Sequence, residues 1–356
     1  MKRTRRSCKR ILPALLAAII MLTGCASNSS AETVTGEEAG TKHQRQVFAM
    51  DTVMFLTAYG PAAEAALDEA EAAIYALEAD LDPENETGSV YAINVGAGSA
   101  VEVSQDCVDI MSTYMHLWQV TGGALDPGLY PIIRAWGFTT DEYRVPSQGE
   151  ISALLAEQDT AAIACDGLAG TVTVPAGMAV SFGAVAKGYT AQRVVDIMAA
   201  AGVESAILSL GGNVQTLGEV KPDGSSWQVA VTDPHDTGAY AGMLSIGQAA
   251  VVTSGGYQRF FQQDGVTYIH IIDPATGYPV DNDLLSVTVV TEDGAYADGM
   301  STALFVMGLE GALDYYEAAG DFELVLITTD DRVIVTPGLA DCFTETSDGY
   351  TYEYLG

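Results

Sequence analysis

Positive charge is scarce in this sequence of 356 residues. It contains 15 Lys and Arg against 47 Asp and Glu, which gives a formal net charge of −32 at pH 7. Proteins bind nucleic acids and anionic lipid surfaces through clustered Lys and Arg, so this composition argues against a general affinity for either. An anionic ligand would need a local device, such as a metal ion, a helix N-terminus or a single Lys.

Cysteine is infrequent as well, with five in the whole chain. Cys8 and Cys25 lie in the N-terminal segment, which leaves Cys107, Cys165 and Cys342 for the rest. Three cysteines make no disulfide framework, and the sequence has no C-x-x-C motif. Cys107 falls in a helical pattern and is expected to be buried. The cysteines therefore give no indication of thiol chemistry.

The first 25 residues have the pattern of a bacterial lipoprotein signal. "MKRTRRSCKR" carries six of the fifteen Lys and Arg, "ILPALLAAIIML" is a short apolar run, and "LTGC" ends in Cys25. A basic start, an apolar stretch that is short for a membrane span and small residues before the cut are typical of export signals. We expect cleavage after residue 24 and lipidation of Cys25, which would hold the protein on the outer side of the cell membrane. An uncleaved membrane helix is the alternative.

The remaining chain divides into a tether and one folded unit. Residues 25–46 are polar and lack apolar periodicity, so a lipidated flexible tether is expected there. Residues 47–356 are predicted to form one catalytic domain. Apolar spacing predicts helices over residues 64–81, 107–123, 186–202 and 296–309, the second with Val108, Met111, Met115 and Trp118 on one face. β-rich runs predict strands at 47–60, 205–210, 227–232, 249–254, 257–261, 266–272, 284–291, 322–329 and 332–336. Helices and strands mix without strict βαβ alternation, which indicates an α+β fold.

The stretch "YIHIIDPATGYP", residues 268–279, has two interpretations. Asp273, Pro274 and Gly277 are ordinary turn residues, so a tight turn after a strand explains it. Alternatively, the strand end holds His270 and Asp273 at a reactive centre.

Asp298 and Thr302 lie four residues apart in the last predicted helix and therefore on the same side of it. That helix is apolar nearly all round and is expected to be buried, where an unpaired carboxylate is costly. Carboxylate and hydroxyl oxygens are ligands that Mg²⁺ accepts beside water and phosphate. The alternative is that Asp298 caps the helix and Thr302 bonds back to the backbone.

Glycine-containing turns offer further candidate binding segments. In "SFGAVAKGY", Gly183 and Gly188 bracket a helix start with Lys187 in its first turn, which would suit phosphate, although a surface Lys explains it as well. The double glycines of "TGGALDP" and "LSLGGN" permit close approach of backbone to a flat ligand, and plain turns explain both equally.

Taken together and in order, these stretches resemble the FAD:protein FMN transferases, the ApbE family. The resemblance covers residues 47 to about 340 and rests on "MDTVM", "GGALDPGLYPIIRAWGF", "FGAVAKGY", "LSLGGN", "TSGGYQRFF", "HIIDPATGYP" and "ADGMSTALFVMG". It implies a T-fold-like α+β domain with largely antiparallel sheets that binds FAD and Mg²⁺. It also implies transfer of FMN from FAD to a Thr or Ser hydroxyl of an exported or membrane redox protein, with release of AMP.

The resemblance also assigns roles to individual residues. Asp298, Thr302 and the carbonyl of Ala184 correspond to Mg²⁺ ligands, His270 to the base that takes the acceptor proton, and Asp273 to the same catalytic motif. The residues that correspond to the FAD cleft are Met50, Gly123, Ala124, Leu125, Asp126, Ser181, Lys187, Ser254 and Gly255.

The sequence departs from the family pattern at several of these stretches. The family usually has Asp at Ser181, Gly at Asp51, Phe at Leu125, Thr at Gly128 and a second His at Ile269, and Leu81 stands where an aromatic residue often stacks on the flavin. These departures concern the affinity for FAD and its exact pose more than the reaction class. Hydrolysis of FAD to FMN and AMP, and a flavin-binding lipoprotein without catalysis, are the alternative functions.

Overall fold

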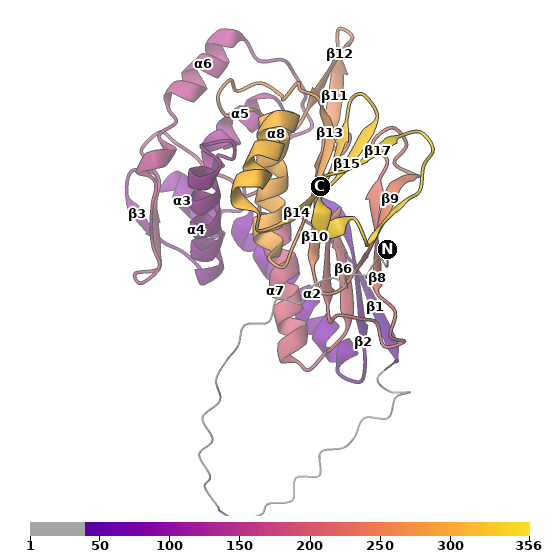
Figure 1. Ribbon diagram of the computed structural model, residues 1–356. Helices are drawn as coiled ribbons and strands as arrows, with labels where there is room; N and C mark the ends of the chain where they lie inside the picture. The colour runs from indigo at the N-terminus through magenta and orange to yellow at the C-terminus, as the bar shows by residue number, and fades with distance from the viewer. Residues whose placement is uncertain (1–39) are drawn as a thin grey trace, which may run out of the picture.

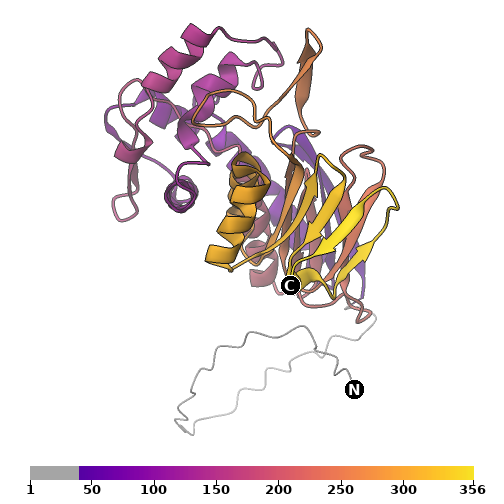
Figure 2. The same ribbon diagram turned by 45° about the horizontal axis from the view of Figure 1, so that its top comes forward.

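The computed structural model describes residues 40–356 (Figures 1 and 2). The predicted signal peptide, Cys25 and most of the predicted tether lie outside these residues. Within the described part of the chain, no helix is both long and apolar enough to cross a membrane.

A nine-stranded sheet forms the centre of the molecule. Its order is β1-β2-β6-β7-β10-β13-β14-β15-β17, and every neighbouring pair is antiparallel except β15 with β17. The strands are β1 (Lys42–Ala49), β2 (Thr52–Tyr59), β6 (Ala206–Leu210), β7 (Asn213–Leu217), β10 (Ala250–Gly255), β13 (Leu284–Thr291), β14 (Glu323–Thr328), β15 (Arg332–Val335) and β17 (Thr351–Tyr354). The structure confirms the predicted α+β class with largely antiparallel sheets.

The two faces of this sheet are covered differently (Figure 2). On one face lie α2 (Ala63–Leu81), α7 (Ala186–Ala200) and α8 (Gly294–Ala319). On the other lies a three-stranded sheet of order β16 (Phe343–Glu345), β9 (Tyr240–Ile246) and β8 (Trp227–Thr232). Each side has its own apolar core. Leu67 of α2 and Val194 of α7 pack with Leu208 on the helical side, whereas Trp227 and Leu244 pack with Val325 on the other.

A second group of short elements packs against α8 (Figure 1). It contains α3 (Ser89–Val95), α4 (Gln105–Val120), α5 (Tyr130–Ala135), α6 (Gln148–Ala156), the 3-10 turns η1 (Pro127–Leu129) and η2 (Thr160–Ala162), and a sheet of β3 (Ala100–Glu102), β5 (Thr171–Thr173) and β4 (Ala164–Asp166); a third such turn, η3 (Pro337–Leu339), lies near the C-terminus. One continuous apolar cluster joins Met111 and Leu117 of α4 to Met300 and Leu304 of α8.

The predicted start of the fold and its first strand were wrong. The first strand begins at Lys42 rather than Val47, and residues 42–59 form a hairpin, β1 with β2, instead of one strand. The turn consists of Met50 and Asp51, both with positive φ, 50° and 58°. Such turns normally carry Asn or Gly, so the sequence lacked the usual turn signal.

The buried face of α4 only partly coincides with the apolar face predicted for the second helix. Val108 and Met111 are buried as expected, but Tyr114 and Leu117 complete the buried face. Met115 and Trp118 remain partly exposed.

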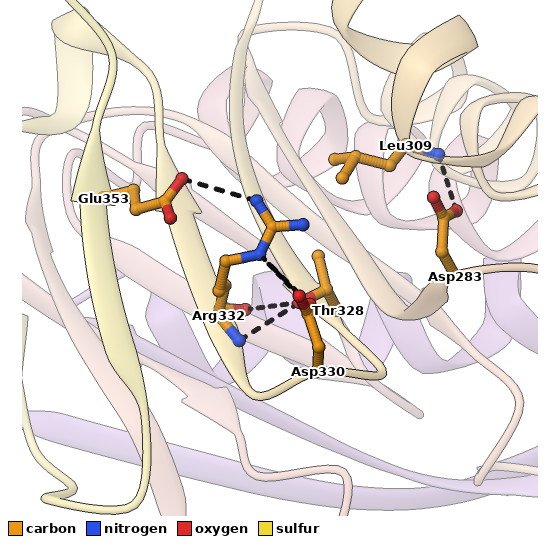
Figure 3. A network of polar contacts seen from close by, with 6 residues as sticks. All are labelled: Asp283, Leu309, Thr328, Asp330, Arg332 and Glu353. Carbon is orange, nitrogen blue, oxygen red and sulfur yellow. Dashed lines mark hydrogen bonds and ion pairs between the residues drawn. The ribbon is translucent and has the colours of Figure 1, made fainter.

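α8 is interrupted at Gly308, where φ is 74° and ψ is −179°. The segment after the break is capped by Asp283, whose Oδ1 accepts the N–H of Leu309 at 2.9 Å (Figure 3). The part of α8 that carries Asp298 and Thr302 therefore ends at Gly308.

A polar network beside this cap fixes the edge of the large sheet (Figure 3). The Thr328 hydroxyl donates to Asp330 at 2.5 Å, and the Arg332 Nε donates to the same carboxylate at 3.1 Å. Arg332 Nη1 lies 3.5 Å from Glu353 on β17. The network joins the β14–β15 turn to the parallel edge strand.

Candidate active site

Asp298 lies where α7 and α8 touch. Its side chain is buried, and its Oδ2 accepts the N–H of Gly188 at 2.8 Å. Gly188 is in the first turn of α7, where backbone N–H groups have no helical partner and favour negative charge. A Cβ at Gly188 would meet the Gly294 carbonyl and the Cβ of Asp298, so the helices come this close because residue 188 has no side chain.

Several groups set the charge of this carboxyl. Burial raises the pKa of Asp298 above its ordinary value, and the positive charge of Lys187, the Gly188 N–H and the amide of Asn213 act against that rise. Asn213, on β7, is buried, and its Nδ2 completes no hydrogen bond of good geometry with the described residues. The Asn213 amide thus lies close enough to influence Asp298 while one donor stays unused.

The predicted alternative for Asp298, a cap on its own helix, was wrong. Asp293 caps α8 by accepting the N–H of Tyr296 at 3.0 Å. Asp298 instead closes the start of α7 from the neighbouring helix.

Thr302 belongs to a small hydroxyl network between α8 and β10. Its Oγ1 is 3.0 Å from the Oγ of Ser254, which is also 2.8 Å from the Oγ of Ser301. Thr302 Oγ1 also donates to the Asp298 carbonyl at 3.4 Å, which is the back-bond expected for a helical Thr. The predicted metal and cofactor residues Asp298, Thr302 and Ser254 are therefore brought together.

Ala184 lies four residues before Gly188, just outside α7. Ala184 is partly buried and packs against the main apolar core. Within residues 40–356, no three His, Cys, Asp or Glu side chains gather as a metal site, so Asp298 would be the anionic ligand among neutral oxygens. An all-oxygen set with one carboxylate fits Mg²⁺, which also binds water and substrate phosphate, and lacks the thiolate or imidazole that zinc sites use.

His270 follows directly on the hairpin of β11 (Phe260–Gln263) and β12 (Val266–Ile269). Its backbone N–H and its Nδ1 both reach the Arg259 carbonyl, at 3.0 and 3.1 Å. A carbonyl oxygen can only accept, so Nδ1 carries the proton and Nε2 of the neutral ring is left as an acceptor.

The surroundings keep the His270 ring neutral. Although the side chain retains part of its exposure, burial by the surrounding protein, followed by the positive charge of Lys187, lowers its pKa to about 4. The positive charge of Lys187 acts on both groups: it lowers the pKa of His270 and opposes the rise in the pKa of Asp298.

Asp273 is occupied by the turn that it begins. Its Oδ1 accepts the Ala275 N–H and its Oδ2 the Thr276 hydroxyl, both at 2.9 Å, while its carbonyl accepts the Gly277 N–H at 2.8 Å. These contacts support the turn interpretation for Asp273 and give no geometric support to a catalytic role beside His270.

Asp126 is likewise held by its own surroundings. It caps η1 by accepting the Gly128 N–H at 2.7 Å, and it accepts the Thr160 hydroxyl at 2.8 Å. Burial raises the pKa of this carboxyl, and these hydrogen bonds together with the Trp118 indole oppose the rise. The carboxylate therefore organises the loop after α4.

Of the other predicted cleft residues, Met50 contacts α7 and Leu125 contacts α8. Met50 donates its N–H to Glu78 at 2.6 Å, and its Sδ accepts from Thr190 on α7 at 3.7 Å. Leu125 is buried and approaches Gly299 of α8. The remaining residues are Gly123 in a positive-φ turn, Ala124 against the main core, Ser181, whose N–H donates to Pro127, and Gly255 at the end of β10.

Three departures from the family pattern have visible structural partners. A Cβ at Gly128 would meet the Gln158 Oε1 and the Met178 side chain, so the larger residue usual in the family does not fit here. Leu81 is buried in the main core instead of facing a ligand. Asp51 is exposed and lies 3.8 Å from the guanidinium of Arg259.

Sequence reasoning missed two contributors. Asn213 ends the "LSLGGN" motif, in which only the two glycines had been interpreted as a binding feature. The Arg259 carbonyl fixes the His270 tautomer through the backbone, which no side-chain pattern signals.

Comparison with known proteins identifies the family of this chain. The ApbE family model matches residues 50–326. A FAD:protein FMN transferase of Treponema pallidum is 33% identical over 79% of this chain and 82% of its own, and one of Klebsiella pneumoniae is 34% identical over 72% and 80%. The crystal structure of an ApbE protein of Thermotoga maritima superposes with a TM-score of 0.76 at 28% identity, covering 82% of this chain and 96% of that one. The chain belongs to the ApbE family.

Proposed function

We propose that this protein transfers FMN from FAD to a Thr or Ser hydroxyl of an acceptor protein and releases AMP. The observation that carries the proposal is the neutral His270, whose Nδ1 donates to the Arg259 carbonyl so that Nε2 is left as the acceptor. The relatives that cover most of this chain are named for the same reaction.

The residues divide the reaction between them. His270 Nε2 accepts the proton of the acceptor hydroxyl as its oxygen forms a bond to the phosphorus of the FMN half. The bond from that phosphorus to the bridging oxygen breaks, and AMP leaves with this oxygen. Lys187, in the first turn of α7, would place a positive charge beside the pyrophosphate, and the helix dipole adds to it.

Asp298, Thr302 and the Ala184 carbonyl would hold Mg²⁺. The ion would neutralise charge on the pyrophosphate when it is bound. Asp298 is suited to this because its burial makes an unpartnered carboxylate costly, so a cation beside it offsets that cost.

The test combines mass spectrometry with AMP detection. Residues 26–356 are incubated with FAD, Mg²⁺ and an exported redox protein as acceptor. We expect the acceptor to gain the mass of FMN, AMP to appear, and both signals to vanish on chelation and in Asp298→Ala. Free FMN and AMP with an unmodified acceptor would indicate a hydrolase instead, and FAD bound intact would indicate a carrier.

We also propose that the protein works on the outer side of the cell membrane, anchored by lipid on Cys25. The support is the signal pattern of residues 1–25. Labelled fatty acid should enter the wild-type protein and not Cys25→Ala. Equal labelling of the two would overturn the anchor.

A further inference from the structure

The β11–β12 hairpin stands apart from the rest of the fold. It forms a two-stranded sheet of its own, and both views show it projecting beyond the neighbouring elements (Figures 1 and 2). Its turn is Asp264-Gly265, both at positive φ, the two-residue loop that suits a tight hairpin. Among the described residues, neither outer edge is paired with a further strand.

The hairpin is firmly anchored on one face. The rings of Phe261 and Tyr268 stack at 5.1 Å, Tyr143 stacks on Phe261 at 5.2 Å, and Trp136 lies 5.3 Å from Tyr268. An isolated two-stranded ribbon is only marginally stable in water, and this aromatic packing holds it in place. The edges are therefore presented by a fixed element.

The composition of the hairpin differs from that of the whole chain. Residues 260–269 contain a single charged side chain, Asp264 at the tip, in a protein of net charge −32. Phe260 and Val266 are about half exposed. Exposed sheet edges are ordinarily protected by charge, and interface cores are depleted of it.

The strand register shows which backbone groups face outward. The N–H of His270 donates to the carbonyl of Arg259, so these two residues form a hydrogen-bonded pair. Because hydrogen-bonded pairs recur at every second residue, Phe261–Tyr268 and Gln263–Val266 are the next two such pairs. In an antiparallel pair the residues between such hydrogen-bonded positions point their N–H and C=O away from the partner strand. On β12 these are Thr267 and Ile269, and on β11 they are Phe260 and Gln262.

We propose that the free edge of β12 binds the acceptor protein as an added, extended strand. The inference rests on the proposed transferase function and identifies how its protein substrate is held. Val266 and His270 are four residues apart, about 13 Å along an extended strand. A segment of four or five residues paired with β12 would therefore run from the hairpin tip to Nε2 of His270 and place one hydroxyl side chain there. In such strand addition, backbone hydrogen bonds give affinity, and alternate side chains give specificity.

The experiment uses a matched pair of proline variants. Thr267→Pro removes an outward N–H on the β12 edge, and Gln262→Pro removes the equivalent N–H on the β11 edge; neither N–H takes part in the ladder between the strands. The probe is an array of twelve-residue synthetic peptides, each with one Thr among small and β-branched residues. Peptide binding is measured with fluorescently labelled protein, and FMN transfer by flavin fluorescence.

We expect Thr267→Pro to weaken peptide binding about tenfold, the loss that a missing backbone hydrogen bond and a displaced neighbouring strand produce. Gln262→Pro should bind within about twofold of wild type, and FAD affinity should be unchanged in both. Equal binding by all three proteins, equal losses in the two variants, or no peptide binding by wild type would each overturn the β12 edge as the docking surface. If wild type binds peptides in the expected pattern but transfers no FMN, the docking surface stands and the proposed transferase function fails.

Discussion

At the scale of single residues, the protonation of His270 should set the acid limit of activity. An ordinary His has a pKa of about 6.5, whereas burial and Lys187 lower this one to about 4. The ring therefore stays neutral, and able to accept a proton, at pH values where an exposed His is charged. We expect the acid limb of kcat/KM for FAD to lie below pH 6.5, measured as AMP release between pH 4 and 8. An acid limb at or above 6.5 would contradict this assignment.

The same pKa shift affects stability. Because the folded pKa is lower than the unfolded one, the unfolded chain binds more protons between pH 6.5 and about 4, and the free energy of unfolding decreases as pH falls through that range. Above pH 6.5 the contribution is constant. His270→Gln lacks this titration, so in urea unfolding it should lose less stability than wild type between pH 7 and 5.

The site residues show what a sequence can and cannot reveal at this scale. Asp298 was recognisable because a carboxylate in an all-apolar helix needs a partner. The sequence could not show whether Asp273 and Asp126 are site residues or turn residues. Each precedes a Pro, and an Asp-Pro pair has the same pattern whether its carboxylate faces a cleft or caps its own turn. Both prove to be held by local backbone N–H groups. Asn213 gave no distinct signal, since its contact with Asp298 depends on packing between distant segments.

At the scale of elements, the α7–α8 contact should be sensitive to a single methyl group. A Cβ at Gly188 would meet the Gly294 carbonyl and Asp298, whereas a Cβ at Gly149 in α6 would meet nothing within 4 Å. We expect Gly188→Ala to lower the free energy of unfolding by about 1–3 kcal/mol through overpacking. Gly149→Ala should leave it unchanged or raise it by up to about 1 kcal/mol.

Urea unfolding of both variants measures the difference. Gly188→Ala should also raise the Mg²⁺ concentration needed for half-maximal AMP release, because the methyl group displaces the Asp298 carboxylate. If the two variants were equally stable and equally dependent on Mg²⁺, the close helix contact would be disproved.

The elements themselves were predictable where their signals are local. α2, α7 and the first part of α8 follow from apolar spacing, and the Asp264-Gly265 turn separates β11 from β12 as sequence patterns suggest. The β1–β2 hairpin was missed because Met50 and Asp51 carry its turn without Gly or Asn. The order of nine strands depends on pairings between distant segments, such as β2 with β6, and local patterns contain no information on these.

At the scale of the whole molecule, the net charge of −32 opposes the approach of an anionic substrate. Six of the fifteen Lys and Arg lie in the first ten residues, so few remain to offset the acids of the folded part. Lys187 and Arg259 make the surroundings of His270 locally positive. At 0.1 M salt the screening length is about 10 Å, so their attraction acts only at short range. At low salt the field of the whole acidic protein reaches further. Long-range repulsion should therefore dominate the encounter with FAD at low ionic strength.

We expect the association rate of FAD to rise about two- to fivefold between 20 and 300 mM NaCl at constant Mg²⁺, because salt screens this repulsion. Stopped-flow quenching of flavin fluorescence measures the rate, and uncharged riboflavin serves as the control that should show no such rise. Lys187→Met should steepen the dependence by removing a local attraction. If FAD associated more slowly at high salt, local attraction by Lys187 and Arg259 would govern the encounter, and the acidity of the whole molecule would have no part in substrate capture.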